Sequence, residues 1–259
     1  MKIIRNILIG ILLVVALFFG IIFYSFSRTI PLKDHQALSG GAFQVKDGMV
    51  SVGIIPSADG QIILVDCGND HNAKAILNAL KQMGVGREAV RTILLTHAHP
   101  DHISGCGAFP EAEVFAMALE QSLLEGRMAA RSPIGFLMGK KDSGIRVTRY
   151  LQDGDSLQRG NVLVTAYLIP GHTDGSAAYL AAGTLYLGDS ADSAKDGSLL
   201  PAKWFASNNA AQNRASLKKL AEELKPRASE IQFVEFAHSG PLPGIAPLLN
   251  FANNTPTNP

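Results

Sequence analysis

The chain has 259 residues, of which 47% are hydrophobic and 17% are charged. That length suits one large domain or two small ones, and two cysteines are too few to hold a disulfide-rich miniprotein together. The apolar content excludes a chain that is disordered throughout. A net charge of +1 provides no basic surface, so no nucleic-acid partner is expected.

The most apolar part of the chain lies near its N-terminus. Residues 7–26 carry no charge and consist mainly of Ile, Leu, Val and Phe. As a helix this run would span roughly 30 Å, the thickness of a bilayer core. Lys2 and Arg5 precede it and weakly favour a cytoplasmic N-terminus. We therefore expect residues 1–28 to be a single-pass membrane anchor, with the following domain on the extracytoplasmic side.

A cleaved signal peptide is the alternative for this segment. Ser25 and Ser27 provide small residues at the spacing that a signal peptidase reads. Cleavage there would release a secreted or periplasmic protein. The apolar run is long for a signal peptide, and this length favours the uncleaved anchor.

The rest of the chain divides into three parts. Residues 29–41 contain Pro31 and two adjacent glycines without clear periodicity, so we expect a linker. Residues 42–252 are expected to form one folded domain. Residues 253–259 are polar and proline-containing, and we expect a disordered tail there.

Short β-rich runs alternate with helical patterns inside the folded domain. The patterns predict strands at 49–55, 61–66, 91–96, 113–117, 162–169, 179–181, 184–187 and 231–236. They predict helices at 72–83 and 216–224. Two β-rich halves that each carry helices predict an α/β fold, either an αββα sandwich or another mixed arrangement.

The densest group of metal-binding side chains follows the expected strand 91–96. It contains His97, His99, Asp101 and His102. In extended chain His97 and His99 point to the same side, and Pro100 can then begin a helix that turns the next two residues toward them. Imidazole and carboxylate ligands suit zinc, iron or manganese better than calcium. A single histidine would more often be a core residue, but this spacing favours a metal site.

Three further residues of the same kinds follow later strands. They are His172, Asp189 and His238. Ligands at the ends of neighbouring strands can meet in one cleft. Five histidines and two aspartates are too many for one ion. We therefore expect two ions with three protein ligands each and one bridging carboxylate.

These motifs resemble those of the metallo-β-lactamase superfamily. The resemblance rests on His97-x-His99-x-Asp101-His102, Val65-Asp66-Cys67-Gly68, Gly154-Asp155-Ser156-Leu157, Pro170-Gly171-His172-Thr173, Gly188-Asp189-Ser190 and His238, which occur in that order over residues 44–247. The resemblance implies an αββα domain with a dinuclear metal site.

The resemblance also implies a role for each residue. His97, His99 and His172 would hold the first metal, Asp101, His102 and His238 the second, and Asp189 would bridge them, with Asp66 supporting the metal loop by hydrogen bonds. Asp101 is also the expected catalytic residue. Two divalent metal ions, most simply Zn²⁺, would supply a metal-bound hydroxide that hydrolyses a small ester, thioester, lactone or phosphodiester.

Asp189 discriminates among activities of the superfamily. The β-lactamases that the chain resembles have a cysteine at this position or lack the bridging carboxylate, so antibiotic hydrolysis is disfavoured. Lactonases, thioesterases of the glyoxalase II type, phosphodiesterases and nucleases similar to RNase Z have the aspartate, and the near-neutral charge disfavours the nucleases. Two other interpretations stay open: an iron-dependent redox enzyme similar to persulfide dioxygenases, and a non-catalytic, membrane-tethered metal-binding module.

Two segments without ligands could form the substrate pocket. Residues 119–141 combine apolar side chains with Arg127 and Arg131, and residues 199–208 contain Trp204. They could make an apolar lid whose cations accept an anionic or amphiphilic substrate. The alternative is an ordinary packed helix and a loop with one buried aromatic residue.

The two cysteines each lie beside a metal-binding motif. A disulfide between Cys67 and Cys106 is conceivable in an oxidising compartment, but small buried thiols are the expectation.

Overall fold

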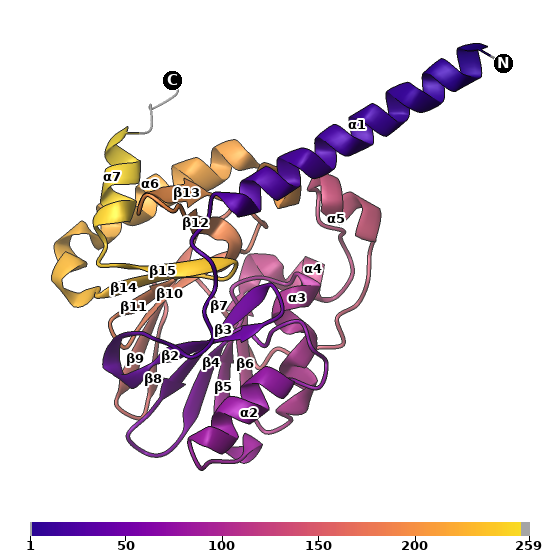
Figure 1. Ribbon diagram of the computed structural model, residues 1–259. Helices are drawn as coiled ribbons and strands as arrows, with labels where there is room; N and C mark the ends of the chain where they lie inside the picture. The colour runs from indigo at the N-terminus through magenta and orange to yellow at the C-terminus, as the bar shows by residue number, and fades with distance from the viewer. Residues whose placement is uncertain (1, 255–259) are drawn as a thin grey trace.

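A computed structural model describes residues 2–254 of the chain (Figure 1). Within these residues, two mixed β-sheets pack face to face. The seven-stranded sheet has the order β1 (Gln36–Ala37), β2 (Phe43–Asp47), β3 (Val50–Pro56), β4 (Ile62–Val65), β5 (Val90–Leu94), β6 (Glu113–Met117) and β7 (Arg149–Leu151). The six-stranded sheet has the order β15 (Ser239–Pro243), β14 (Phe233–Phe236), β11 (Thr184–Tyr186), β10 (Ala177–Ala181), β9 (Val162–Leu168) and β8 (Ser156–Arg159).

Helix α2 (Lys74–Gln82) packs on the outer face of the first sheet, and α6 (Ala210–Leu224) and α7 (Ala246–Asn254) pack on that of the second. The described residues also form α1 (Lys2–Ser27), α3 (Pro100–Ile103), α4 (Gln121–Leu124) and α5 (Pro133–Met138). A short antiparallel pair, β12 (Ala191–Ser193) and β13 (Leu199–Pro201), lies beside the second sheet. The expected αββα sandwich is therefore confirmed, and the expected strand 113–117 coincides with β6.

The strands alternate between two hydrophobic layers. On β4, Ile62 and Leu64 pack with residues of α2, whereas Ile63 and Val65 belong to the layer between the sheets. A third layer joins the second sheet to α6 through residues such as Leu217. Because both faces of the central strands are buried, the sequences of these strands are continuous apolar runs.

Strand direction brings the predicted ligands to one edge of the sandwich. β4 and β5 are parallel, so Asp66 and His97 follow them at the same edge of the first sheet. In the second sheet β11 and β14 are parallel, which places Asp189 and His238 together just beyond their ends. His172 follows β9, whose direction matches that of β11 because β10 is antiparallel to both.

The N-terminal helix α1 projects away from the sandwich (Figure 1). By length and composition it can cross a membrane, with a mean hydropathy of 3.0 and no buried residue. The expected linker is attached to the domain directly behind the helix. Thr29 pairs with Ala194 as a β-bridge, and the backbone N–H of Ile30 donates to the carbonyl of Ser193 at 3.0 Å.

Helix α7 continues through Asn254, so it includes the first two residues of the expected tail. The remaining tail residues, 255–259, lie outside the described part of the chain.

The expectation of two free thiols is wrong, because Cys67 and Cys106 form a disulfide with a Cα–Cα distance of 5.2 Å. The backbone N–H of Cys67 donates to the carbonyl of His102 at 2.6 Å, which brings the turn Ser104–Ala108 beside the end of β4. A Cβ atom on Gly105 would lie 2.3 Å from the carbonyl oxygen of Cys67. Glycine at this position therefore permits the approach that joins the two cysteines.

Candidate metal centre

The first group of ligands lies where β5 gives way to helix α3. His99 has an extended backbone and caps this helix, and Pro100 occupies its first turn. The helix then directs Asp101 and His102 toward the same space as His97. The geometry that the sequence predicted for this motif is present.

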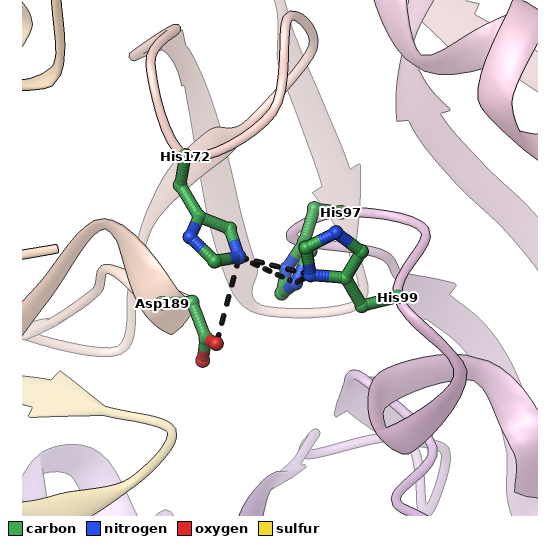
Figure 2. Close-up of side chains that lie close together, drawn as sticks. All are labelled: His97, His99, His172 and Asp189. Carbon is green, nitrogen blue, oxygen red and sulfur yellow. Dashed lines mark hydrogen bonds and ion pairs between the residues drawn. The ribbon is translucent and has the colours of Figure 1, made fainter. Parts of the chain in front are cut away.

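Four side chains converge in the first cluster, as Figure 2 shows. His97 Nε2 lies 3.0 Å from His99 Nδ1, and His172 Nε2 lies 3.1 Å and 3.0 Å from these two atoms. Asp189 Oδ2 lies 3.5 Å from His172 Nε2.

The second cluster contains Asp101, His102 and His238. Asp101 Oδ2 lies 3.3 Å from His238 Nε2 and 3.7 Å from His102 Nε2. Asp189 also reaches this cluster: its Oδ1 lies 3.2 Å from His102 Nε2, and its Oδ2 lies 3.2 Å from His238 Nε2. Asp189 thus stands between the two clusters, in the place of a bridging ligand.

The spacing of the donor atoms and their lack of other partners suit bound metal ions. Three nitrogen atoms about 3 Å apart match the ligands of a tetrahedral zinc, which would stand ~3.3 Å apart at usual Zn–N lengths. His102 Nε2 and Asp189 Oδ1 are buried, and apart from their 3.2 Å contact with each other neither has a hydrogen-bond partner among the described residues. Buried polar atoms rarely lack partners, and two cations would satisfy these.

The second ring nitrogen of four ligands is held by a hydrogen bond. His97 Nδ1 lies 3.1 Å from Thr96 Oγ1, His102 Nδ1 lies 2.8 Å from Asp66 Oδ2, His172 Nδ1 lies 3.2 Å from Ser207 Oγ, and His238 Nδ1 lies 2.6 Å from the carbonyl oxygen of Met49. A protonated Nδ1 in each ring leaves Nε2 as the free ligand atom. In His99 the ligand atom is Nδ1, and its buried Nε2 has no hydrogen-bond partner among the described residues.

Asp66 makes hydrogen bonds to both ends of the histidine motif. Besides the contact with His102, its carboxylate accepts hydrogen bonds from the backbone N–H and the hydroxyl of Thr96, both at 2.7 Å. Its backbone has a φ of 63°, a left-handed conformation that aspartate tolerates better than most residues. Asp66 therefore fixes both His102 and the start of the histidine motif.

Burial and charge set the protonation of the ligands. Burial lowers the pKa of His97 well below its usual value and that of His172 to about 3, so both rings stay neutral and able to bind metal. Burial would also lower the pKa of His238, but the carboxylates of Asp189 and Asp101 raise it to about 10. This half of the site therefore attracts positive charge.

One buried carboxylate beside the site was not predicted from the sequence. Glu120 accepts hydrogen bonds from the backbone N–H of Ala98 at 2.7 Å, from Thr173 Oγ1 at 2.8 Å and from the backbone N–H of Gly175 at 2.9 Å. Burial raises its pKa to about 7, against the effect of these hydrogen bonds. Glu120 therefore ties the loop of His97 and His99 to the loop of His172.

The structure separates the three predicted pocket residues. Arg131 pairs with Asp174 at 2.6 Å, close to the loop of His172, whereas Arg127 pairs with Glu125 on the surface. Trp204 is 50% exposed and stacks edge-on with Phe205. Residues 119–141 form two short helices, α4 and α5, instead of one packed helix.

A cavity of about 480 Å³ lies beside the first cluster. His99 and Pro100 line one part of it, and its other walls come from the turn Ser104–Ala108 and from residues before and after α5. Arg127, Arg131 and Trp204 are not among its lining residues.

Comparisons with known proteins agree with this geometry. The family model for the metallo-beta-lactamase superfamily matches residues 45–230. The mouse (Mus musculus) metallo-beta-lactamase domain-containing protein 1 is 42% identical over 112 residues, which are 34% of this chain and 43% of that protein. Hydroxyacylglutathione hydrolase of Aeromonas hydrophila is 30% identical over 163 residues, 61% of this chain and 51% of that protein. The chain thus spans about half the length of these relatives.

Solved structures share the fold. A structure described as the first B3 metallo-beta-lactamase with an active-site glutamic acid aligns with a TM-score of 0.65, covering 89% of this chain and 90% of that chain. The two sequences are 19% identical, so this likeness concerns the fold alone.

Proposed function

Because this chain belongs to the metallo-β-lactamase superfamily, we propose that it is a dinuclear metal-dependent hydrolase of a small ester, thioester, lactone or phosphodiester. The observation that carries the proposal is the position of Asp189, whose two oxygens lie 3.2 Å from ligands of the second cluster while Oδ2 also faces His172. One carboxylate between two clusters is what a pair of adjacent metal ions requires.

Each of the two clusters would hold one metal ion. His97, His99 and His172 would hold one ion, Asp101, His102 and His238 the other, and Asp189 both. Metal ions held there would lower the pKa of a water molecule and polarise the carbonyl or phosphoryl oxygen of the substrate. Zinc suits these nitrogen and oxygen ligands.

The protein supplies orientation and access. Hydrogen bonds on the second ring nitrogens keep the imidazoles in fixed directions, so little reorganisation is needed during the reaction. The Asp101 side chain is 38% exposed, compared with 13% for Asp189. We therefore assign Asp101 the catalytic task of orienting the attacking water toward the substrate.

Three observations narrow the substrate class. An aspartate at position 189 disfavours antibiotic hydrolysis, because the β-lactamases that the chain resembles have a cysteine or no bridging carboxylate there. The relative from Aeromonas hydrophila is named hydroxyacylglutathione hydrolase, which favours an acyl substrate such as a thioester. The net charge of +1 gives no support for a nucleic-acid substrate.

We further propose that α1 anchors the enzyme with its domain on the extracytoplasmic side. The disulfide between Cys67 and Cys106 supports that side, because disulfides persist in oxidising compartments. A mass measurement of the N-terminus of the mature protein decides between this anchor and a signal peptide cleaved after Ser27. An intact N-terminal segment supports the anchor.

Exposed apolar side chains near the end of α1 support contact with a membrane surface. The Lys203 Nζ atom lies 4.5 Å from the centre of the Phe26 ring, directly before the turn Trp204–Ala206. Helix α5 packs against this turn and leaves Phe136 77% and Leu137 82% exposed. This face would rest on the bilayer, with the metal centre just above it.

The proposed activity is tested with the purified full-length protein. We expect about two zinc ions per chain, hydrolysis of at least one ester, thioester, lactone or phosphodiester substrate, loss of activity with a chelator and recovery with zinc. His99→Ala should abolish turnover while the circular dichroism spectrum is retained. His35→Ala is the matched control, because His35 stacks on Phe43 away from both clusters.

Two results would contradict the proposal. Tightly bound iron with oxygen uptake would assign the chain to redox chemistry. Undiminished activity of His99→Ala or Asp101→Ala on every substrate that the wild type cleaves would remove the metal clusters from the reaction.

A further inference from the structure

The cavity beside the first metal cluster is mainly apolar. Its walls include Ile103, Phe109, Val114, Leu123 and Ile145, and His99 joins them at the metal centre. Its volume of about 480 Å³ lies within the range of pockets that hold small molecules, which is about 300–1,000 Å³. A ligand in this cavity would therefore have one end beside a metal ligand and the rest among hydrocarbon side chains.

The charged side chains of the cavity wall are solvent-exposed. They are the cations Lys141 and Arg146 and the carboxylate Asp142, so positive charge exceeds negative. Neither cation forms an ion pair with any described residue. An apolar interior with cations at the rim matches an amphiphile that has a hydrocarbon chain and carries negative charge.

We propose that this cavity binds the hydrocarbon chain of the substrate, so that the enzyme hydrolyses medium- or long-chain acyl esters or thioesters. The proposal rests on the proposed hydrolase function and specifies its substrate class. His99 belongs both to the cavity wall and to the first cluster, so an acyl chain in the cavity would have one end beside that cluster. Burial of the chain would drive binding.

Gly107 is a position from which a larger side chain can be introduced into the cavity. It lines the cavity, and a Cβ atom added there would meet no heavy atom within 4 Å. Gly107→Ala and Gly107→Trp therefore form a matched pair: both restrict the backbone equally, but only tryptophan occupies the space of a ligand.

The first test measures hydrolysis by the full-length protein in phosphatidylcholine nanodiscs. Acetyl, octanoyl and dodecanoyl substrates are compared, each as an ester and a thioester. In the wild type, kcat/KM should rise with chain length by up to about fourfold for each buried methylene. Gly107→Ala should keep this preference, and Gly107→Trp should reduce the ratio of dodecanoyl to acetyl kcat/KM at least tenfold. An unchanged ratio in Gly107→Trp overturns the proposal.

The second test does not depend on catalysis. A photoreactive dodecanoic acid with a diazirine at its end is irradiated with the full-length protein in the same nanodiscs, and labelled peptides are identified by mass spectrometry. Labelling of the peptide around Phe109 and Val114, lost in Gly107→Trp and kept in Gly107→Ala, supports a chain-binding cavity even if no hydrolysis is found.

The two tests separate the cavity from the activity. Labelling without any hydrolysis would contradict the proposed function and leave the chain-binding site intact. Hydrolysis without labelling of the cavity would support the proposed function and contradict the chain-binding site. Labelling combined with a chain-length preference that Gly107→Trp does not change would show that the cavity holds a membrane lipid, which overturns the assignment of the substrate chain.

Discussion

The ring of Phe26 lies edge-on against the imidazole of His238, with the ring centres 6.1 Å apart and the planes at 89°. Phe26 belongs to the last turn of α1, and His238 is one of the predicted ligands of the second metal. The N-terminal helix is thus in contact with the metal centre itself.

Replacing Phe26 should therefore affect the reaction. Aromatic contacts of this type contribute about 0.5–1.5 kcal/mol, so Phe26→Ala should lower kcat/KM by roughly three- to tenfold through a less firmly held His238. Steady-state kinetics and zinc content are measured together. Phe23→Ala is the control, because Phe23 lies in the same helix and is 75% exposed. Equal activities of the two variants would show that the contact has no role.

Glu120 should make stability depend on pH. Its pKa rises from an ordinary 4.5 to about 7 on folding, so the folded protein binds the proton more tightly than the unfolded chain. As the pH rises from about 4.5 to about 7, the free energy of unfolding of the wild type should therefore fall by about 3 kcal/mol relative to that of Glu120→Gln. Urea unfolding of the metal-free protein at several pH values measures this difference.

A control and a second readout accompany the Glu120 experiment. Glu111→Gln is the control for the loss of one surface carboxylate, because Glu111 is exposed and pairs with Arg91. A profile of Glu120→Gln that runs parallel to that of the wild type would contradict the assigned burial. Glutamine also places an amide against the N–H of Gly175, and weaker positioning of His172 should lower kcat.

Asp66→Asn should weaken metal binding more than it weakens the fold. Asparagine tolerates the left-handed backbone at this position, but it removes the carboxylate that holds His102 Nδ1. Loss of such a partner typically costs ten- to a hundredfold in metal affinity. Titration against a competing chelator measures the change. Asp47→Asn is the matched control, because Asp47 is likewise an aspartate that accepts backbone hydrogen bonds, here from the N–H groups of Asn69 and Asp70 and not from a histidine of the clusters.

The disulfide should contribute measurably to stability. Cys67 and Cys106 are separated by 39 positions, and closing a loop of that size stabilises a protein by about 2–4 kcal/mol. The double variant Cys67→Ala with Cys106→Ala should lower the free energy of unfolding in denaturant by this amount. A wild-type protein that shows the same stability with and without a reducing agent would argue against the bond.

The sequence predicted which side chains come together because their signal is local. The spacing of His97, His99 and His102 is readable without any knowledge of distant contacts, and each of the other ligands follows a strand with a clear apolar pattern. The αββα fold was expected from the two β-rich halves and from the resemblance, and the structure has it.

Contacts between distant segments could not be read in this way. In the sequence, Glu120 cannot be told apart from an ordinary surface acidic residue. Its role depends on contacts with Ala98 and Thr173, which are distant in the chain. The strands β12 and β13 have three residues each, too few for a periodic pattern. The disulfide depends on the close approach at Gly105, which no spacing in the chain reveals.

The ligands come from both sheets of the sandwich. His97, His99, Asp101 and His102 follow the first sheet, and His172, Asp189 and His238 follow the second. Neither half of the chain can complete either ion's coordination by itself, so metal binding and the docking of the sheets are thermodynamically linked. Two fully coordinated ions would therefore act as a cross-link between the halves, and their uptake would mark the end of folding.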